Sequence, residues 1–237
     1  MNVAVIVAGG QGDRLGAHGG KQLLLVDGRP VLVHTIVAFD ACEAIDSIVV
    51  VAHPERVDEY RARAVEPSGS PKVIAVVAGG PTRAASVRAG LAAVPEEADV
   101  IVVHDGARPL VTPELIEDAI GALGVAEGTD AIVVGHPSYD TLKVVDDSGR
   151  VTGTADRSAL WAAQTPQVFR ASALRACYAA PDDALQGATD DAALVERAGG
   201  VVRVFGGPRD NIKVTVPEDV TMVEALLASR RKRGADG

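Results

Sequence analysis

A glycine-rich segment with two basic residues, GGQGDRLGAHGGKQ at 9–22, offers the clearest chemistry in the chain. It directly follows an apolar run at 2–8 that is typical of a strand buried on both faces. In open parallel sheets, ligands bind beyond the carboxyl ends of the strands, and glycine lets backbone N–H groups approach a phosphate closely. Because Arg14 and Lys21 would add positive charge there, the segment predicts a phosphate-binding loop.

Two common phosphate-loop patterns do not fit this segment. The dinucleotide pattern G-x-G-x-x-G, started at Gly10, requires glycine where the chain has Leu15. The pattern G-x-x-x-x-G-K-[ST] fails at Leu15 and again at Gln22. A third pattern, G-x-G-x-R followed seven residues later by lysine, is typical of nucleotidyltransferases that act on sugar phosphates. It is matched in full, at Gly10, Gly12, Arg14 and Lys21.

Short runs of β-branched residues alternate with helical patterns along the first half of the chain. The predicted strands are 2–8, 46–52, 72–78, 99–104 and 130–135. The predicted helices between them lie near 30–41, 54–65, 82–94 and 112–125. This repeated order predicts an α/β fold, a Rossmann-like sandwich with a mostly parallel central sheet and right-handed crossovers.

The pattern changes near residue 137. Residues 141–157 alternate around an Asp-Ser-Gly turn and predict an extended hairpin with little apolar mass of its own. We therefore expect it to lean on a partner subunit, as a β-arm insertion at 137–159 within a single domain of residues 1–237. Helices near 170–179 and 189–198, a strand at 201–205 and a last helix at 217–231 complete the prediction.

Composition excludes several classes of protein. An apolar content of 47% rules out global disorder, and no apolar run approaches the roughly 20 residues that span a bilayer. The net charge of −9 argues against a general nucleic-acid surface. The basic run at 230–233 is either a nucleic-acid arm or, more simply, the cationic end of a helix that frays into a tail. Two distant cysteines without Cys-x-x-Cys spacing favour a reduced, cytoplasmic location.

Further motifs follow the loop in a fixed order. They are GGPTRAASV at 79–87, HDGARP at 104–109, DTLK at 140–143, DR at 156–157, QTPQ at 164–167, TDD at 189–191 and DNIKVT at 210–215. Together with the loop, they resemble the 2-C-methyl-D-erythritol 4-phosphate cytidylyltransferases of the non-mevalonate isoprenoid pathway, over nearly the whole chain. The resemblance implies transfer of a cytidylyl group from CTP to methylerythritol phosphate, with release of pyrophosphate. It also implies Mg²⁺ bound mainly through the CTP phosphates, and a homodimer whose β-arm reaches the neighbour's site.

The resemblance carries roles over to particular residues. It implies that Arg14 and Lys21 stabilise charge on the α-phosphate, and that Arg157 and Lys213 position the substrate phosphate. The implied nucleotide-binding positions are Ala8, Gly9, Gly10, Gly12, Gly80, Ser86 and Asp105. The implied substrate-binding positions are Arg108, Thr141, Arg157, Thr165, Thr189, Asp210 and Lys213. No protein ligand is expected for the metal.

The proposed chemistry agrees with these residue types. A phosphate monoester has a second pKa of about 6, so it is already a nucleophilic dianion at neutral pH and needs no general base. Repulsion between two anions is the main obstacle, and converging cations would relieve it. The loop departs from the family at Asp13, where a second arginine is frequent, and at Gly20, where proline is frequent.

Two other functions share part of this pattern. A ribitol 5-phosphate cytidylyltransferase would keep the CTP loop and differ in the polyol pocket, whereas DNIKVT at 210–215 favours the isoprenoid enzyme. A noncatalytic nucleotide-binding regulator would not need both Arg14 and Lys21.

Overall fold

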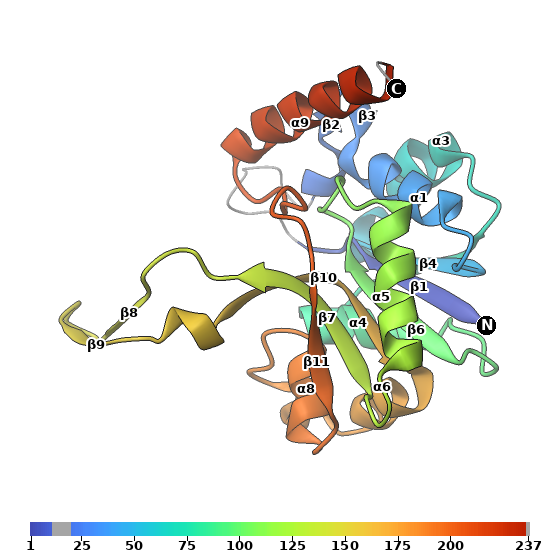
Figure 1. Cartoon of the computed structure of the whole chain (residues 1–237). Coiled ribbons are helices and arrows are strands. Elements are labelled where there is room, and N and C mark those ends of the chain that lie inside the picture. The colour runs from blue at the N-terminus through green and yellow to red at the C-terminus, as the bar shows by residue number, and fades with distance from the viewer. Residues whose placement is uncertain (11–19, 236–237) are drawn as a thin grey trace.

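A seven-stranded sheet lies at the centre of the part of the chain that the computed structural model describes, residues 1–10 and 20–235 (Figure 1). Its strands are β1 (Asn2–Val7), β4 (Ser47–Ala52), β5 (Val73–Ala78), β6 (Val100–Asp105), β7 (Ala131–Pro137), β10 (Trp161–Arg170) and β11 (Val202–Gly206). Their order is β11-β7-β10-β6-β1-β4-β5. Only β10 runs antiparallel to its neighbours in this described sheet. The predicted α/β fold with a mostly parallel sheet is confirmed.

Helices cover both faces of the sheet. On one face lie α1 (Val31–Ala41), α5 (Pro113–Val125) and a helical segment at 54–68. On the other face lie α4 (Arg83–Leu91), α6 (Ala171–Tyr178), α7 (Asp182–Leu185) and α8 (Ala192–Arg197). The two faces form separate hydrophobic clusters because successive side chains of a strand point in opposite directions.

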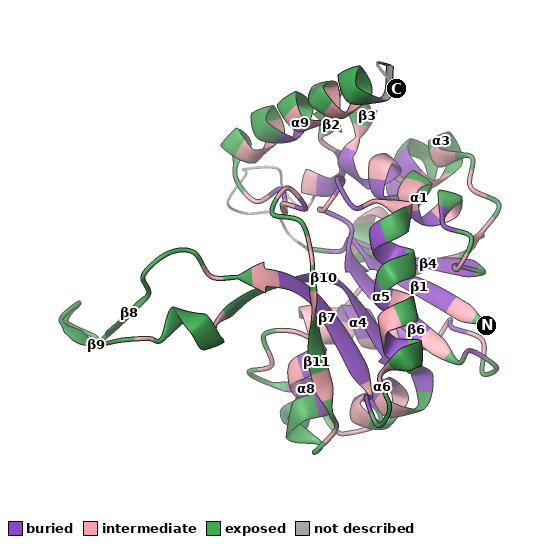
Figure 2. Cartoon of the chain, viewed as in Figure 1, coloured by how far each residue is buried: buried purple, intermediate pink, exposed green. Residues whose placement is uncertain are grey.

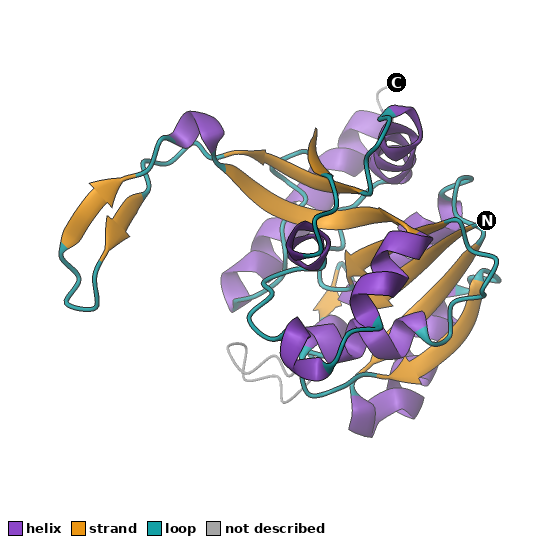
Figure 3. Cartoon of the chain, turned by 90° about the horizontal axis from the view of Figure 1, so that it is seen from below, coloured by secondary structure: helices purple, strands orange, loops and turns teal. Residues whose placement is uncertain are grey.

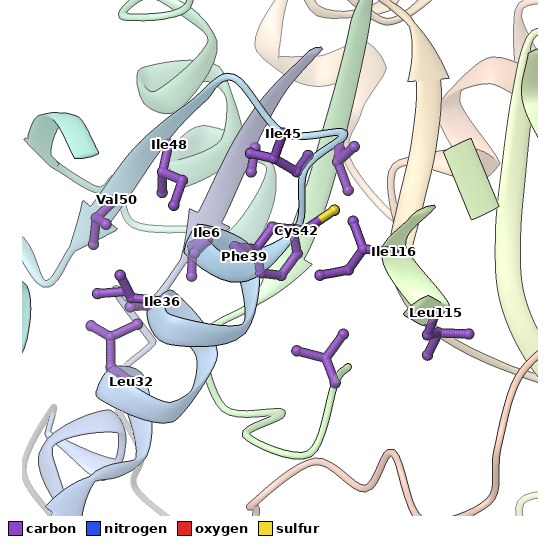
Figure 4. Packing of buried hydrophobic residues seen from close by; sticks show 14 of the residues in the cluster. Ile6, Leu32, Ile36, Phe39, Cys42, Ile45, Ile48, Val50, Leu115 and Ile116 are labelled. Atoms are coloured by element: carbon purple, nitrogen blue, oxygen red, sulfur yellow. The ribbon is translucent and has the colours of Figure 1, made fainter. Parts of the chain in front are cut away.

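Strand β1 shows this alternation most simply. Ala4 and Ile6 belong to the α1–α5 cluster, whereas Val3 and Val5 belong to the α4–α6–α8 cluster. Figure 4 shows side chains of α1, among them Phe39, gathered over the strands of the sheet. Because the central strands are buried on both faces, they read as continuous apolar runs in the sequence (Figure 2).

The helical segment at 54–68 is composite rather than one regular helix. It passes through a 3-10 turn (Pro54–Arg56), α2 (Val57–Tyr60), a π-helical turn (Arg61–Val65) and α3 (Glu66–Ser68). Proline lacks the N–H that an α-helix interior requires, and the π-helical turn comes just before Pro67. The prediction of helix at 54–65 is right in kind and stops too early.

Strand β10 was absent from the prediction, and it lies in the middle of the sheet between β6 and β7. Its register against β7 shifts between Ala163 and Gln167, and Pro166 lies inside that irregular stretch. Proline inside a strand is confined to edges and bulges, so it argues against a central strand when only the sequence is seen. The bulge explains why this strand tolerates it.

The predicted hairpin is confirmed. Strands β8 (Lys143–Val145) and β9 (Val151–Thr154) pair antiparallel, and the hairpin extends away from the body (Figure 1, Figure 3). At its tip, Asp146 Oδ1 accepts hydrogen bonds from the backbone N–H groups of Ser148, at 2.9 Å, and Arg150, at 3.1 Å. Gly149 supplies the left-handed residue of the turn, with φ +80°. We call residues 138–160, which join β7 to β10, the arm.

The C-terminal helix α9 (Pro217–Ala235) packs against the body through Val223, which joins a third cluster with Val26, Val31, Leu110 and Val214. The last helix was predicted at 217–231 and extends to Ala235, with the basic run in its C-terminal part. The first two arginines of that run bind the body. Arg230 donates to Leu110 O at 2.8 Å and to Asp210 Oδ2 at 3.0 Å. Arg231 forms an ion pair with Asp27.

Asp27 lies in a small hairpin that the prediction missed. Its strands are β2 (Leu25–Val26) and β3 (Arg29–Pro30), and Asp27 and Gly28 between them both have positive φ, of 52° and 73°. An Asp-Gly pair is a strong hairpin signal, and it is present in the sequence. Among the helices at 1–10 and 20–235, none has the length and apolar character needed to cross a membrane.

Candidate active site

Four parallel strands, β1, β4, β5 and β6, end at the same edge of the sheet, and a cavity of about 750 Å³ opens there. That volume is in the range of small-molecule binding sites. The predicted residues that line it are Gly9, Gly10, Lys21, Gly80, Ser86, Asp105 and Lys213. Residues far apart in the sequence therefore meet where the parallel-sheet rule expects a ligand.

The turn from β5 into α4 forms one wall of this cavity. Thr82 caps the helix, since its Oγ1 accepts from Ala85 N at 3.0 Å. Ser86 Oγ accepts from Gly80 N at 3.1 Å and lies 3.0 Å from Thr82 O, as a donor to it. A Cβ at Gly80 would lie 2.5 Å from the Ala85 Cβ, so only glycine allows this close turn. The wall presents backbone groups and the positive end of a helix dipole to a ligand.

The segment that carries Lys21 is held from the other side. Lys21 begins a 3-10 turn (Lys21–Leu23) immediately after Gly20, and a side chain at position 20 would meet the Arg56 guanidinium. Arg56 is bound to Glu59 through Nε at 2.6 Å and Nη2 at 2.9 Å. Glycine at position 20, the departure from the family noted above, therefore makes room for this arginine.

Tyr60 connects the two ends of the glycine-rich loop. Its buried hydroxyl lies 3.1 Å from Ala8 O and 3.1 Å from Gln22 Oε1. Burial raises the pKa of Tyr60 to about 12, so the hydroxyl stays protonated at neutral pH. Ala8 itself is fully buried and does not line the cavity, and its carbonyl oxygen accepts from the Tyr60 hydroxyl. The predicted residues Gly12 and Arg14 lie outside the described residues, as does Asp13.

Asp105 is the electrostatic centre of the opposite wall. Its Oδ2 lies 2.9 Å from Lys213 Nζ and 3.6 Å from Arg108 Nε, and its Oδ1 lies 3.5 Å from Arg83 Nε. Burial by itself raises the pKa of this carboxyl. The attraction of Lys213, Arg83 and Arg108 outweighs burial, and the net effect is a pKa below the ordinary value. Asp105 is therefore ionised and surrounded by cations.

Backbone and side-chain hydrogen bonds fix the surroundings of Asp105. Thr165 Oγ1 accepts from Asp105 N at 3.0 Å. This threonine, predicted to bind substrate, therefore holds the backbone of Asp105. Arg108 donates to Asn211 O at 2.7 Å, and the fully buried Asn211 donates through Nδ2 to Thr165 O at 2.8 Å. The HDGARP, QTPQ and DNIKVT motifs are thus joined in one network, which explains why they occur together.

His104 precedes Asp105 and is fully buried against Phe39, with ring centroids 5.0 Å apart. Burial lowers its pKa to about 3, so the ring is neutral at physiological pH. Its Nε2 lies 3.3 Å from Arg108 O. This histidine supports the loop that carries Asp105 and does not line the cavity.

Several predicted residues do not line the cavity in the described chain: besides Ala8 and Thr165, they are Thr141, Arg157, Thr189, Asp210 and Arg108. Thr141 and Arg157 are exposed on the arm, where Arg157 donates to Tyr139 O at 3.4 Å. Thr189 is exposed just before α8. Asp210 pairs with Arg230 of α9. Arg108 is also absent from the lining, and it reaches the site through Asp105.

The sequence analysis missed Arg83, which lines the cavity and bridges two carboxylates. The signal was present, because Arg83 lies within GGPTRAASV at the predicted start of a helix after a strand. Only the structure shows that Asp191, more than a hundred residues away, is its second partner.

No group of three or more His, Cys, Asp and Glu side chains at 1–10 and 20–235 is arranged to hold a metal ion. Among the residues that the structure describes, Glu55 and Asp105 are the acidic ones on the cavity wall, and Asp105 already faces Arg83, Arg108 and Lys213. This donor set suits a cation that arrives with a polyphosphate better than one held by side chains.

Comparisons with known proteins agree on one family. The family model for 2-C-methyl-D-erythritol 4-phosphate cytidylyltransferase matches residues 2–229. A protein of that name from Rubrobacter xylanophilus is 45% identical over 234 residues, which cover 98% of this chain and 97% of that protein. Another, from Microcystis aeruginosa, is 40% identical over 226 residues, covering 95% and 98%.

Solved structures give the same result. The crystal structure of 4-diphosphocytidyl-2C-methyl-D-erythritol synthase from Anaerococcus prevotii superposes with a TM-score of 0.82 at 29% identity, covering 96% of both chains. That of 2-C-methyl-D-erythritol 4-phosphate cytidylyltransferase from Thermus thermophilus has a TM-score of 0.76 at 28% identity, covering 96% of this chain and 100% of that one.

Proposed function

Since the chain belongs to the 2-C-methyl-D-erythritol 4-phosphate cytidylyltransferase family and transfers the cytidylyl group from CTP to that polyol phosphate, we propose that the cavity beyond β1, β4, β5 and β6 is where the transfer occurs. One observation carries the assignment. A glycine and helix-end wall at Gly80 and Ser86 shares the cavity with the cations Lys21 and Lys213. The nucleoside part of CTP would lie on the wall at Gly80 and Ser86, and its phosphates would lie near the cations.

In this proposal, an oxygen of the substrate phosphate attacks the α-phosphorus of CTP in line, and the bond to the pyrophosphate leaving group breaks. CDP-methylerythritol and pyrophosphate are the products. The attacking dianion needs no base. His53 lines the cavity, but its Nδ1 accepts from Glu55 N at 3.3 Å as the cap of the 3-10 turn, and His104 is buried. Catalysis then consists of positioning and of neutralising charge.

The cations divide this work. Lys21, with Arg14, would stabilise charge on the α-phosphate, and Lys213 would position the attacking phosphate. At about 4 Å and an effective dielectric constant of about 20, each such charge pair contributes roughly 4 kcal/mol before desolvation. Asp105 holds Lys213 in place before substrate arrives, since the two groups are 2.9 Å apart. The Gly80–Ser86 wall would bind the cytosine base.

We include Mg²⁺, held mainly by the CTP phosphates, as the cofactor. When bound, it offsets phosphate charge that the side chains do not neutralise. Asp105 is not offered as its ligand, since three cations already surround that carboxylate.

We further propose a homodimer in which the arm completes the neighbour's site. The arm carries Thr141 and Arg157, which do not line the cavity of their own chain. It also exposes apolar side chains that a partner could cover, at Tyr139, Leu142, Val144, Val145 and Val151. The same side chains would be a solubility liability on a monomer. A cytoplasmic location fits the two free cysteines.

The first test measures pyrophosphate release with CTP, Mg²⁺ and methylerythritol phosphate, beside ribitol 5-phosphate as the control. Release with methylerythritol phosphate alone supports the proposal. Release only with ribitol 5-phosphate would keep the CTP site and overturn the polyol assignment. CTP binding without release from either would favour a regulator. The family and its relatives do not favour these two alternatives.

The second test addresses the shared site. Lys21→Ala and Arg157→Ala proteins are each expected to be nearly inactive. If the arm serves the neighbour, a mixture of both forms heterodimers with one intact site, and activity returns to at most about a quarter of wild type. Without recovery after verified subunit exchange, the arm would have to act on its own chain.

A further inference from the structure

Arg83 lies at the first turn of α4 and spans two carboxylates from different parts of the chain. Its Nε lies 3.5 Å from Asp105 Oδ1 on the cavity wall, and its Nη2 lies 2.8 Å from Asp191 Oδ2. Burial lowers the pKa of this guanidinium, but Asp191 and Asp105 outweigh burial and raise it. Arg83 is therefore a permanent cation whose charge is already offset on both sides.

Asp191 is only 1% exposed and lies directly before α8. Its other oxygen, Oδ1, accepts from the Tyr178 hydroxyl of α6 at 2.5 Å. A buried carboxylate with two such partners cannot turn away without leaving a charge unpaired, which is strongly unfavourable. Asp191 therefore fixes the direction of the Arg83 side chain.

The orientation of Asp105 follows from that of Arg83. With Oδ1 turned toward Arg83, the other oxygen faces Lys213 at 2.9 Å and Arg108 at 3.6 Å. Lys213 is the cation that the proposed function places on the attacking phosphate. A chain of contacts thus runs from α6 and α8, through Asp191 and Arg83, to Asp105 and Lys213.

We propose that Arg83 is a positioning residue for the transfer reaction, held by Asp191 so that Asp105 aligns Lys213 with the substrate phosphate. An arginine beside an anion site would otherwise turn onto the triphosphate. Here the buried Asp191 keeps it away from the phosphates, so its effect is on alignment rather than on nucleotide affinity. This inference rests on the proposed function.

The kinetic test compares Arg83→Gln and Arg83→Lys with wild type. Misplacement of a positioning group by about 1 Å costs on the order of 10²-fold, so we expect kcat to fall about 10²-fold in Arg83→Gln. Lysine keeps the positive charge, but its single charged centre cannot span two carboxylates. Arg83→Lys should therefore recover only part of the loss, to a kcat about 10-fold below wild type. The KM for CTP should change less than about 3-fold in both variants, because neither substitution removes a contact that binds CTP in the ground state.

A double-mutant cycle tests the role of Asp191. If Asp191 acts through Arg83, Asp191→Asn lowers kcat by itself, and Arg83→Gln/Asp191→Asn is no worse than Arg83→Gln within about 3-fold. The double variant leaves neither charge alone in the interior, so it remains measurable if Arg83→Gln unfolds. Thermal melting of each protein separates loss of folding from loss of alignment.

Arg88 provides the matched control. It lies on the same helix, pairs with Asp182, and donates to Ala180 O at 2.6 Å, so it also ties α4 to the α6–α7 region, but it does not line the cavity. Arg88→Gln should keep kcat within about 2-fold of wild type, as expected for a surface pair.

Three outcomes overturn the inference while leaving the proposed function intact. They are additive losses in the double variant, a raised KM for CTP with unchanged kcat, and an equal loss of kcat in Arg88→Gln. Failure of the wild-type protein to turn over methylerythritol phosphate would instead remove the proposed function.

Discussion

The cavity wall and the arm carry residues of the same predicted site, yet they are held by different means. Around Asp105, each group is fixed by strands, buried hydrogen bonds and ion pairs of its own chain. Thr141 and Arg157 lie on the arm, in which no residue is buried (Figure 2). The difference teaches that a sequence motif marks a residue's chemistry but not which chain supplies its support.

Lys21→Ala gives the largest expected effect and tests the cavity side of this comparison. Removing one preorganised transition-state donor lowers turnover by about 10²-fold or more. Steady-state kinetics, with folding checked by thermal melting, measures it. A folded variant with near wild-type turnover would show that the cavity wall is not the reacting site.

The next largest expected effect is the pH dependence of stability that His104 causes. This histidine is buried behind the cavity wall, on the supported side of the comparison. Its folded pKa of about 3 lies below the unfolded value of about 6.5, so the unfolded state binds the extra proton. Stability therefore falls as pH drops from about 6.5, by up to about 1.4 kcal/mol per pH unit, or about 2 kcal/mol at pH 5.

The measurement is denaturant unfolding at pH 7.5 and pH 5. In His104→Asn, this part of the pH dependence should disappear, whatever the variant loses at pH 7.5. Asp105, whose pKa is lowered below its ordinary value, contributes stability that is lost only at more acidic pH. An unchanged slope in His104→Asn would assign the effect to other groups.

Arg230→Gln tests whether α9 helps to hold residues of the site in place, as the buried network does on the cavity wall. Arg230 holds Asp210, which the family resemblance assigns to the polyol, and both side chains are about 30% exposed. We expect the KM for methylerythritol phosphate to rise about 5-fold to 10-fold, while partial solvent screening limits the stability loss to about 1 kcal/mol. Arg231→Gln, which removes the pair with Asp27, is the control and should leave this KM unchanged.

Val144→Ala gives the smallest effect and tests the arm. The side chain is 54% exposed, so the free energy of unfolding in a dilute sample should change by less than about 0.5 kcal/mol. Val50→Ala, at a fully buried position of β4, should cost about 2 kcal/mol. A Val144→Ala cost that grows with protein concentration would mean that another subunit covers the arm.

Much of the sheet was predictable because parallel strands buried on both faces leave continuous apolar runs. The runs at 46–52 and 99–104 became β4 and β6 within two residues at each end. Strand β10 was not predictable in this way. Its sequence WAAQTPQVFR contains proline and polar residues that serve the bulge and the network around Asp105.

The site was predictable where one motif holds its own residues. Gly80 and Ser86 bond within a single turn, and Lys21 follows its glycines directly. Arg83 was missed because its role depends on Asp191, a partner that neither spacing nor periodicity identifies. Arg157 was named from the resemblance alone, and its place in one chain does not bring it to the cavity.

The antiparallel direction of β10 also bears on the order in which the sheet can assemble. Strands β7 and β10 are consecutive in the large sheet, with the arm as their connection, whereas β1 must find β6 after almost a hundred residues of intervening chain. Loop-closure entropy grows slowly, by about 0.6 kcal/mol for each doubling of length. A long arm therefore adds little to the cost of closing the β7–β10 pair. The half of the sheet that carries the arm can form early, as a local nucleus, before the distant strands around the glycine-rich loop are brought together.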